Sequence, residues 1–263
     1  MERPDPEPRA PETSFDPQVV PTPSTPACLF LDVDGTVIDF AATPDAVHVD
    51  EQLIELLTDV QHAVQGALAL VSGRSIAVLD QLFDPLRLPA AGVHGFERRD
   101  VNGALHRQAL LDEPLIAART ALERFVAAHE GLLLEDKGSA LAVHYRRAPH
   151  FGELVRTIVA GLPIAKAPGF ELLDGDAVLE IKPASNNKAT AIEAFMQEAP
   201  YAGRLPIFLG DDLTDYDGFA AVRRHAGVTI AVGNRVFAQW QLPDPPAVRT
   251  WLRNFALAQG RMR

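Results

Sequence analysis

Apolar residues fall into two kinds of run along the chain. Short runs that are apolar at every position are typical of parallel strands buried on both faces of a sheet. They lie at 27–31, 67–71, 90–93, 205–209 and 228–232. Between them apolar residues recur at helical spacing, as after Asp50, a suitable N-cap for a helix that reaches Val64. Alternating strands and helices predict an open α/β sheet.

The middle of the chain has a different pattern. Segments that predict two helices and four short antiparallel strands follow one another there, at 114–129, 132–135, 140–146, 150–162, 170–173 and 178–181. The turn sequence Asp-Lys-Gly-Ser joins the first two strands, as expected of a hairpin. We therefore expect a separate α+β module at 108–184, inserted between two halves of an α/β core at 27–107 and 185–258.

The N-terminal segment differs in composition from the rest. Its first 26 residues hold eight of the 21 prolines and five acidic residues. Such a segment buries too little apolar surface to offset its ordering entropy, which predicts a disordered, partly extended tail at 1–26. The whole chain is 47% hydrophobic and 22% charged, as in ordinary globular proteins. Its apolar runs fall well short of the ~18 residues that a membrane span needs, so we expect no membrane association.

The charge and the cysteine content of the chain exclude further classes of protein. The chain has 24 basic and 35 acidic residues and a formal net charge of −11. This excess of acid argues against nucleic-acid binding, since phosphate backbones favour clustered cations. Cys28 is the single cysteine, which excludes an intramolecular disulfide and favours a reducing, cytoplasmic location. A small anionic substrate is still compatible with this net charge if local cations or a metal ion make the electrostatic potential at the binding site positive.

Polar clusters follow the predicted core strands, at the sheet edge where α/β proteins bind ligands. Asp32 and Asp34 follow the first strand, Ser72 the second and Asp211 a later one. Three carboxylates gathered in one crevice repel unless a cation lies among them, and hard oxygen ligands select Mg²⁺. Such a site suits phosphoryl transfer, with Asp32 as nucleophile and Asp34 as general acid and then base. Ser72 and Lys188 are candidates for holding the phosphoryl oxygens.

These motifs, in this order, resemble a known superfamily. Asp-Val-Asp-Gly-Thr at 32–36, Ser-Gly-Arg at 72–74, Lys188 and Gly-Asp-Asp-Leu-Thr-Asp at 210–215 are similar to the four motifs of the haloacid dehalogenase (HAD) phosphatases. More narrowly, four further segments resemble the trehalose-6-phosphate phosphatase family: 93–95, 134–139, 143–146 and 180–183. The resemblance covers about residues 28–255.

The resemblance implies a Rossmann-like core with a parallel sheet and a mobile α+β (C2-type) cap that closes over a sugar. It implies Mg²⁺-dependent hydrolysis of trehalose 6-phosphate through an aspartyl-phosphate, in trehalose biosynthesis. By carry-over, Asp32, the backbone carbonyl of Asp34 and Asp211 bind the metal. By the same carry-over, the residues that bind the phosphate group are Ser72, Gly73 and Lys188. Two further residues, Asp215 and Arg74, support this site. The sugar-binding candidates are Lys137, His144, Arg146, Glu180 and Lys182.

Two positions depart from the family pattern. Ala189 follows Lys188 where the family has glycine, and Tyr216 follows Asp215 where the family has an acid. The first departure bears on backbone freedom at a helix start, and the second on an auxiliary carboxylate. Neither touches Asp32, Asp34 or Asp211.

Several other interpretations stay open on the residues alone. A calcium loop at 32–36 is disfavoured because a strand enters it and its twelfth position, Thr43, is not acidic. Lys137 also suits a solvated hairpin tip, Arg74 a structural ion pair and His94 a turn. For the whole chain, the alternatives are a sister phosphatase acting on sucrose phosphate or mannosylglycerate phosphate, a phospho-accepting receiver and an inactive sugar-binding protein. The sequence does not define an oligomeric state.

Overall fold

The structure is a computed structural model that describes residues 20–23, 25–40, 47–107, 112–185 and 187–260. These residues divide into two compact units. The first is drawn from Met1–Asp39, Val49–Leu70 and Ile192–Arg263, and the second from Phe40–His48 and Val71–Ala191. The predicted insert, 108–184, lies within the second unit. In the described part of the chain, no helix is long and apolar enough to cross a membrane.

The first unit is built on a parallel sheet, as the apolar runs predict. Its strands lie in the order β12-β11-β10-β1-β2, each parallel to its neighbour. Their bounds are β1 Ala27–Leu31, β2 Leu68–Val71, β10 Leu205–Gly210, β11 Val228–Val232 and β12 Trp240–Leu242. The strand β12 was not predicted, because three residues are too few to show the pattern of apolar positions that is typical of a strand. In the register of β1 and β10, Leu31 lies beside Leu209. The residues that follow the two strands therefore lie near each other at the same edge of the sheet.

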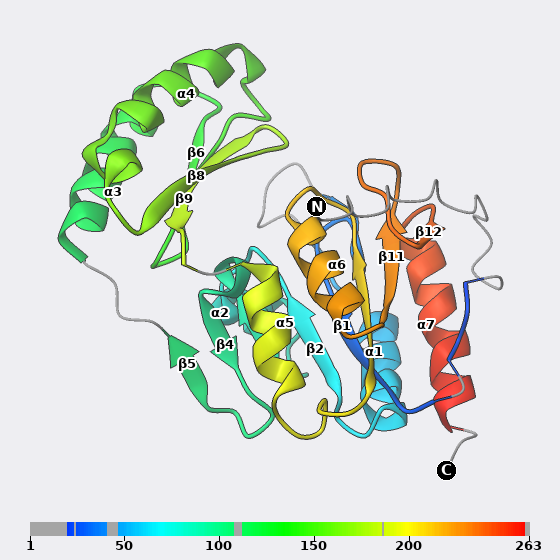
Figure 1. The fold of residues 1–263 in the computed structure, drawn as a ribbon. Coiled ribbons are helices and arrows are strands. Elements are labelled where there is room, and N and C mark those ends of the chain that lie inside the picture. The colour runs from blue at the N-terminus through cyan, green and yellow to red at the C-terminus, as the bar shows by residue number, and fades with distance from the viewer. Residues whose placement is uncertain (1–19, 24, 41–46, 108–111, 186, 261–263) are drawn as a thin grey trace, which may run out of the picture. The chain divides into compact units, whose positions relative to one another are not determined.

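Helices cover both faces of this sheet. Figure 1 shows α6 (Asp215–Arg224) in front of the strands, and α1 (Glu51–Ala63) and α7 (Pro245–Gly260) behind them. The predicted cap of α1 is confirmed, since the Leu53 amide donates to the Asp50 carboxylate at 2.7 Å. The core includes the aromatic cluster of Phe30, Phe195 and Tyr201.

The end of the predicted tail is packed against α7. Val20 is buried, and its carbonyl accepts a hydrogen bond from Trp251 Nε1 at 3.2 Å. Gln259 Nε2 donates to the carbonyl of Pro23 at 2.8 Å. The packed part of the chain therefore begins before Ala27, the residue at which the sequence pattern predicted that order begins. Side chains of α7 hold this proline-rich segment by donating hydrogen bonds to its backbone carbonyls. The rest of the predicted tail, residues 1–19, lies outside the described residues.

The second unit begins with a short antiparallel ladder, β3 (Ala90–Gly92), β4 (Glu97–Arg99) and β5 (Leu105–Arg107), beside helix α2 (Ile76–Leu82). Neither β4 nor β5 was predicted, because each is three residues long and rich in charge. Helix α5 (Lys188–Met196) begins in this unit and ends in the first. It starts at Lys188, as predicted.

A second antiparallel sheet, in the order β6-β7-β9-β8, forms the predicted α+β module. Its strands are β6 Leu133–Asp136, β7 Leu141–His144, β8 Phe170–Gly175 and β9 Val178–Pro183. Helices α3 (Asp112–Ala127) and α4 (Gly152–Gly161) cover one face, where Leu122, Val143 and Ile181 share a buried core. Because strand residues alternate between faces, Glu135, His144, Glu180 and Lys182 lie on the other face, which we call the polar face.

Candidate active site

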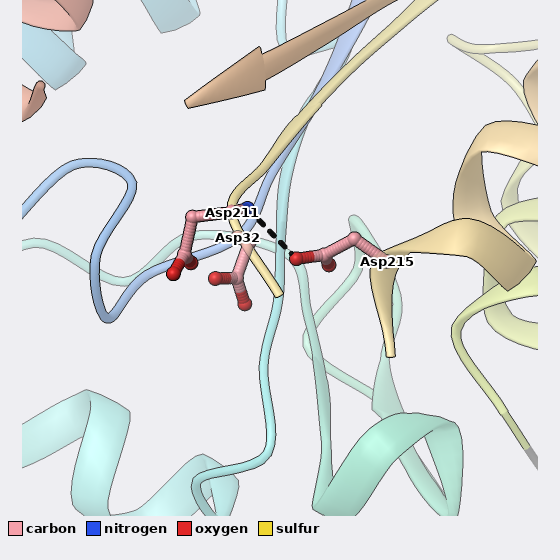
Figure 2. A group of neighbouring side chains, drawn as sticks. All are labelled: Asp32, Asp211 and Asp215. Atoms are coloured by element: carbon pink, nitrogen blue, oxygen red, sulfur yellow. Dashed lines mark hydrogen bonds between the residues drawn. The ribbon is translucent and has the colours of Figure 1, made fainter. Parts of the chain in front are cut away.

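Three carboxylates from distant parts of the chain meet at the ends of the parallel strands. Asp32 follows β1, Asp211 follows β10 and Asp215 begins α6. One carboxylate oxygen from each residue lies within 4.8 Å of the others, and all three residues are buried (Figure 2). The pairing of β1 with β10 explains how residues 179 positions apart reach one place. We call these three residues the acidic cluster.

Backbone and hydroxyl groups hold the acidic cluster in place. The Asp211 and Asp212 amides both donate to Asp215 Oδ2 at 2.9 Å, the first of which is drawn in Figure 2. The Thr36 hydroxyl lies 3.3 Å from Asp32 Oδ2 and 3.3 Å from Asp211 Oδ1. A Cβ at Gly210 would lie 2.3 Å from the Asp215 Cγ, so only glycine leaves room for this carboxylate.

The donor set fits a divalent cation. Three buried carboxylates repel one another strongly at low dielectric. The Arg235 guanidinium lies 3.8 Å from Asp211 Oδ2 and 3.2 Å from Asp212 Oδ1, and one positive charge offsets only part of theirs. Hard carboxylate oxygens are the ligands that Mg²⁺ and similar cations prefer.

The acidic cluster adds the carboxylate of Asp215 to those of Asp32 and Asp211, the two carboxylate ligands expected from the sequence. Asp34 lies past the end of β1, is half-buried and forms an isolated bridge with Ile38. The ligand atom expected of Asp34 was its backbone carbonyl, not its carboxylate. Asp215, expected to support the site, places its carboxylate beside those of Asp32 and Asp211. Its spacing of four residues from Asp211, about one helical turn, was the available signal.

The two departures from the family pattern have local explanations. The Tyr216 hydroxyl accepts a hydrogen bond from the Phe237 amide at 3.3 Å, so this side chain links α6 to the loop after β11. Before α5, the Thr190 amide donates to Asn187 Oδ1 at 3.1 Å and the Asn187 amide donates to Thr190 Oγ1 at 3.2 Å. These reciprocal bonds cap the helix start without a glycine at Ala189.

The second unit holds the phosphate-binding residues expected from the motifs. Ser72 and Lys188 are both almost fully buried. The Ser72 Oγ accepts a hydrogen bond from the Arg74 amide at 3.1 Å, and the Ser72 amide donates to the Ala91 carbonyl at 2.9 Å. The loop that begins at Ser72 is thus fixed to β3.

On the polar face, Glu180 is the centre of a buried ion pair. Lys137 Nζ lies 2.7 Å from Glu180 Oε2, and His94 Nε2 lies 3.5 Å from the same oxygen. Burial raises the pKa of the Glu180 carboxyl, but Lys137 and His94 outweigh it and lower this pKa to about 2. Lys137 is therefore not a solvated hairpin tip. Lys137 lies in the turn between β6 and β7, and the pairing of β7 with β9 places it beside Glu180, 43 residues later in the chain.

The remaining sugar-binding candidates lie in two different places. His144 Nε2 lies 2.8 Å from Glu135 Oε2, and Lys182 forms an ion pair with Glu171, so both belong to the polar face. Arg146 was expected on the same strand as His144, but β7 ends at His144. The Arg146 guanidinium is exposed and lies 3.0 Å from the Asp176 carboxylate.

His94 was missed by sequence reasoning, which favoured a turn residue with no further role. It is a turn residue, but its ring is buried against Gly73 and Glu180. Burial lowers the pKa of the His94 imidazole, against the opposing effect of Glu180. The segment 93–95 is one of those that resemble the family, but its residues gave His94 no role beyond a turn.

Comparison with solved structures shows which fold the chain has. The C-terminal domain of a trehalose-6-phosphate phosphatase from C. albicans superposes with a TM-score of 0.76 at 22% identity, covering 88% of this chain and 92% of that one. A phosphatase of the haloalkanoate (HAD) superfamily from Bacteroides thetaiotaomicron superposes with a TM-score of 0.59 at 16% identity, covering 88% and 96%. The chain shares the fold of these two solved phosphatases, as the motifs predicted.

Sequence comparison then gives the family. The trehalose-phosphatase family model matches residues 30–242. The trehalose-6-phosphate phosphatase of Escherichia coli (strain K12) is 43% identical over 235 residues, which is 89% of this chain and 88% of that protein. The chain therefore belongs to the trehalose-phosphatase family of phosphoric monoester hydrolases.

Proposed function

We propose that this protein hydrolyses trehalose 6-phosphate to trehalose and phosphate, with Mg²⁺ as cofactor and Asp32 as nucleophile. The observation that carries the proposal is the acidic cluster, in which Asp32, Asp211 and Asp215 are buried together at the ends of parallel strands. Its carboxylates would hold Mg²⁺ together with the Asp34 carbonyl. When bound, the cation neutralises carboxylate and phosphate charge at the reacting centre.

Two steps complete the reaction. An Asp32 oxygen bonds to phosphorus as the bond from phosphorus to the sugar oxygen breaks, while Asp34, as the acid, gives its proton to the leaving alkoxide. Water then bonds to phosphorus and gives a proton to the Asp34 carboxylate. The bond from phosphorus to Asp32 breaks in this second step and releases phosphate. Asp34 thus returns to its starting form.

The remaining assignments rest on motif order and family membership. Ser72, Gly73 and Lys188 bind the phosphate group, and Arg74 supports their loop. The sugar is bound by the polar face of a cap at 108–184, carried by a core at 27–107 and 185–258. The buried pair of Lys137 and Glu180 supports this role, because fixed charges with little mobility bind hydroxyl groups without a large ordering cost. We place the enzyme in the cytoplasm, acting on a small molecule rather than on nucleic acid or membrane.

Phosphate release from a panel of sugar phosphates tests the proposal. We expect trehalose 6-phosphate to be preferred over sucrose phosphate and mannosylglycerate phosphate, with activity that EDTA abolishes and Mg²⁺ restores. The Asp32→Asn variant should lose turnover and keep its melting temperature. Preference for another sugar phosphate would overturn the substrate, and undiminished activity in EDTA would overturn the cofactor. A stable phosphoryl-enzyme without phosphate release would indicate a receiver.

A further inference from the structure

The turn that carries His94 has a strained backbone. Three successive residues lie in the left-handed region, Val93 with φ 48°, His94 with φ 54° and Gly95 with φ 99°. For residues other than glycine this region is sterically unfavourable, and a β-branched residue such as valine is seldom found there. Strain of this kind persists where the surrounding structure fixes it, often at a functional site.

The surrounding contacts show what the strained turn holds. The His94 amide donates to the Ser72 carbonyl at 3.0 Å, and the Val93 amide donates to the Arg74 carbonyl at 2.9 Å. The imidazole covers Gly73, where a Cβ would lie 2.7 Å from His94 Cε1. The turn is thus bound, through backbone and ring, to the loop expected to bind phosphate.

The same imidazole reaches the polar face. Its Nε2 lies 3.5 Å from Glu180 Oε2, which Lys137 also contacts. The other oxygen, Glu180 Oε1, is buried and has no hydrogen-bond partner among the described residues. A buried acceptor without a donor is destabilising, and a hydrogen bond from a ligand hydroxyl would remove that penalty. One oxygen is therefore held by protein, while the other is left for a ligand.

We propose that His94 is a positioning residue, which fixes the Glu180 carboxylate so that Oε1 accepts a hydrogen bond from a hydroxyl of the sugar phosphate. Nε2–H of a neutral imidazole donates to Oε2, while the ring rests on Gly73. The strained turn thereby sets the position of Glu180 relative to the Ser72 loop. The proposal rests on the proposed function, because it presumes a substrate with sugar hydroxyl groups.

Two substrates and a double-mutant cycle test this role. We expect His94→Leu to lower kcat/KM for trehalose 6-phosphate about tenfold or more, chiefly through KM, the loss expected for a hydrogen bond to a charged group. The loss should be at least fivefold smaller for para-nitrophenyl phosphate, which has no sugar. His94→Gln, whose amide nitrogen replaces Nε2, should recover most of the activity. In a Glu180→Gln background, His94→Leu should have little further effect.

The outcomes separate the two proposals. Equal losses on both substrates, or full additivity with Glu180→Gln, would overturn the positioning role and indicate a purely structural histidine. A wild-type enzyme that does not hydrolyse trehalose 6-phosphate would instead overturn the proposed function. If His94→Leu does not fold, the same cycle uses His94→Asn, whose shorter amide does not reach the place of Nε2. A soluble His94→Asn variant with wild-type KM would overturn the role equally.

Discussion

Replacing Gly210 by alanine tests how tightly the acidic cluster is built. Gly210 ends β10, immediately before Asp211, and its backbone φ lies outside the left-handed region, so alanine meets no backbone penalty there. The new methyl group would lie 2.3 Å from Asp215 Cγ, 2.6 Å from Oδ2 and 2.7 Å from Cβ. Contacts this short force either the strand or the Asp215 side chain to move.

The size of the effect follows from the two ways to relieve these contacts. Shifting the backbone is an overpacking change of about 1–3 kcal/mol. Turning Asp215 away instead loses two hydrogen bonds to a charged group, about 1.5–3 kcal/mol each. The cheaper route sets the loss, so we expect the free energy of unfolding to fall by about 1–3 kcal/mol. For a chain of this size the melting temperature falls by about 2–4 °C per kcal/mol.

Thermal melting and Mg²⁺ titration of activity measure the two consequences. We expect Gly210→Ala to melt lower than wild type and to need more Mg²⁺ for half-maximal activity. Gly161→Ala is the matched control, because the φ of Gly161 also lies outside the left-handed region and its Cβ would meet nothing within 4 Å. If Gly210→Ala and Gly161→Ala had the same melting temperature and Mg²⁺ requirement, the packing of Asp215 against Gly210 would not constrain the site.

Two further substitutions probe the electrostatics. Thr36→Val removes the hydroxyl between Asp32 and Asp211, about 1 kcal/mol of hydrogen bonding, and should change the Mg²⁺ needed for half-maximal activity severalfold; an unchanged titration would exclude this hydroxyl from the site. Glu180→Gln removes a carboxylate whose pKa falls from 4.5 to about 2 on folding. That stabilisation, about 3 kcal/mol, is present above pH ~4.5 and lost as the pH falls towards ~2. Urea unfolding should therefore separate wild type from variant at pH 7 and bring them together near pH 2; a gap independent of pH would contradict the ion pair.

The sequence predicted the parts of the fold where hydrophobic pattern decides structure. Buried parallel strands such as β1 and β10 are apolar at every position, and α1 begins at a side chain that caps it. Strands of three residues, such as β4 and β12, show no period and were missed. The order of strands in the sheet is a property of packing that no local pattern contains. The sequence therefore placed Asp32 and Asp211 at strand ends, while their meeting follows from the pairing of β1 with β10.

The site was predicted less completely, for the same reason. Lys137 and Glu180 meet only because β6, β7 and β9 pair in one register. The predicted strand at 140–146 includes His144, which lies on β7, but the observed strand ends before Arg146. The left-handed conformation of Val93 is disfavoured by its own side chain, so a local rule argues against the turn that carries His94. Tertiary contacts overrode local preference there.

The most direct test of the account is to look for the phosphoryl group on Asp32. Wild-type enzyme would be mixed with trehalose 6-phosphate and Mg²⁺, stopped with acid within one turnover, digested and analysed by mass spectrometry. We predict a phosphoryl mass increase on the peptide that contains Asp32, which is absent in Asp32→Asn and in EDTA. Rapid release of phosphate by the wild type with no such peptide, or with the phosphoryl group on another residue, would contradict the central claim.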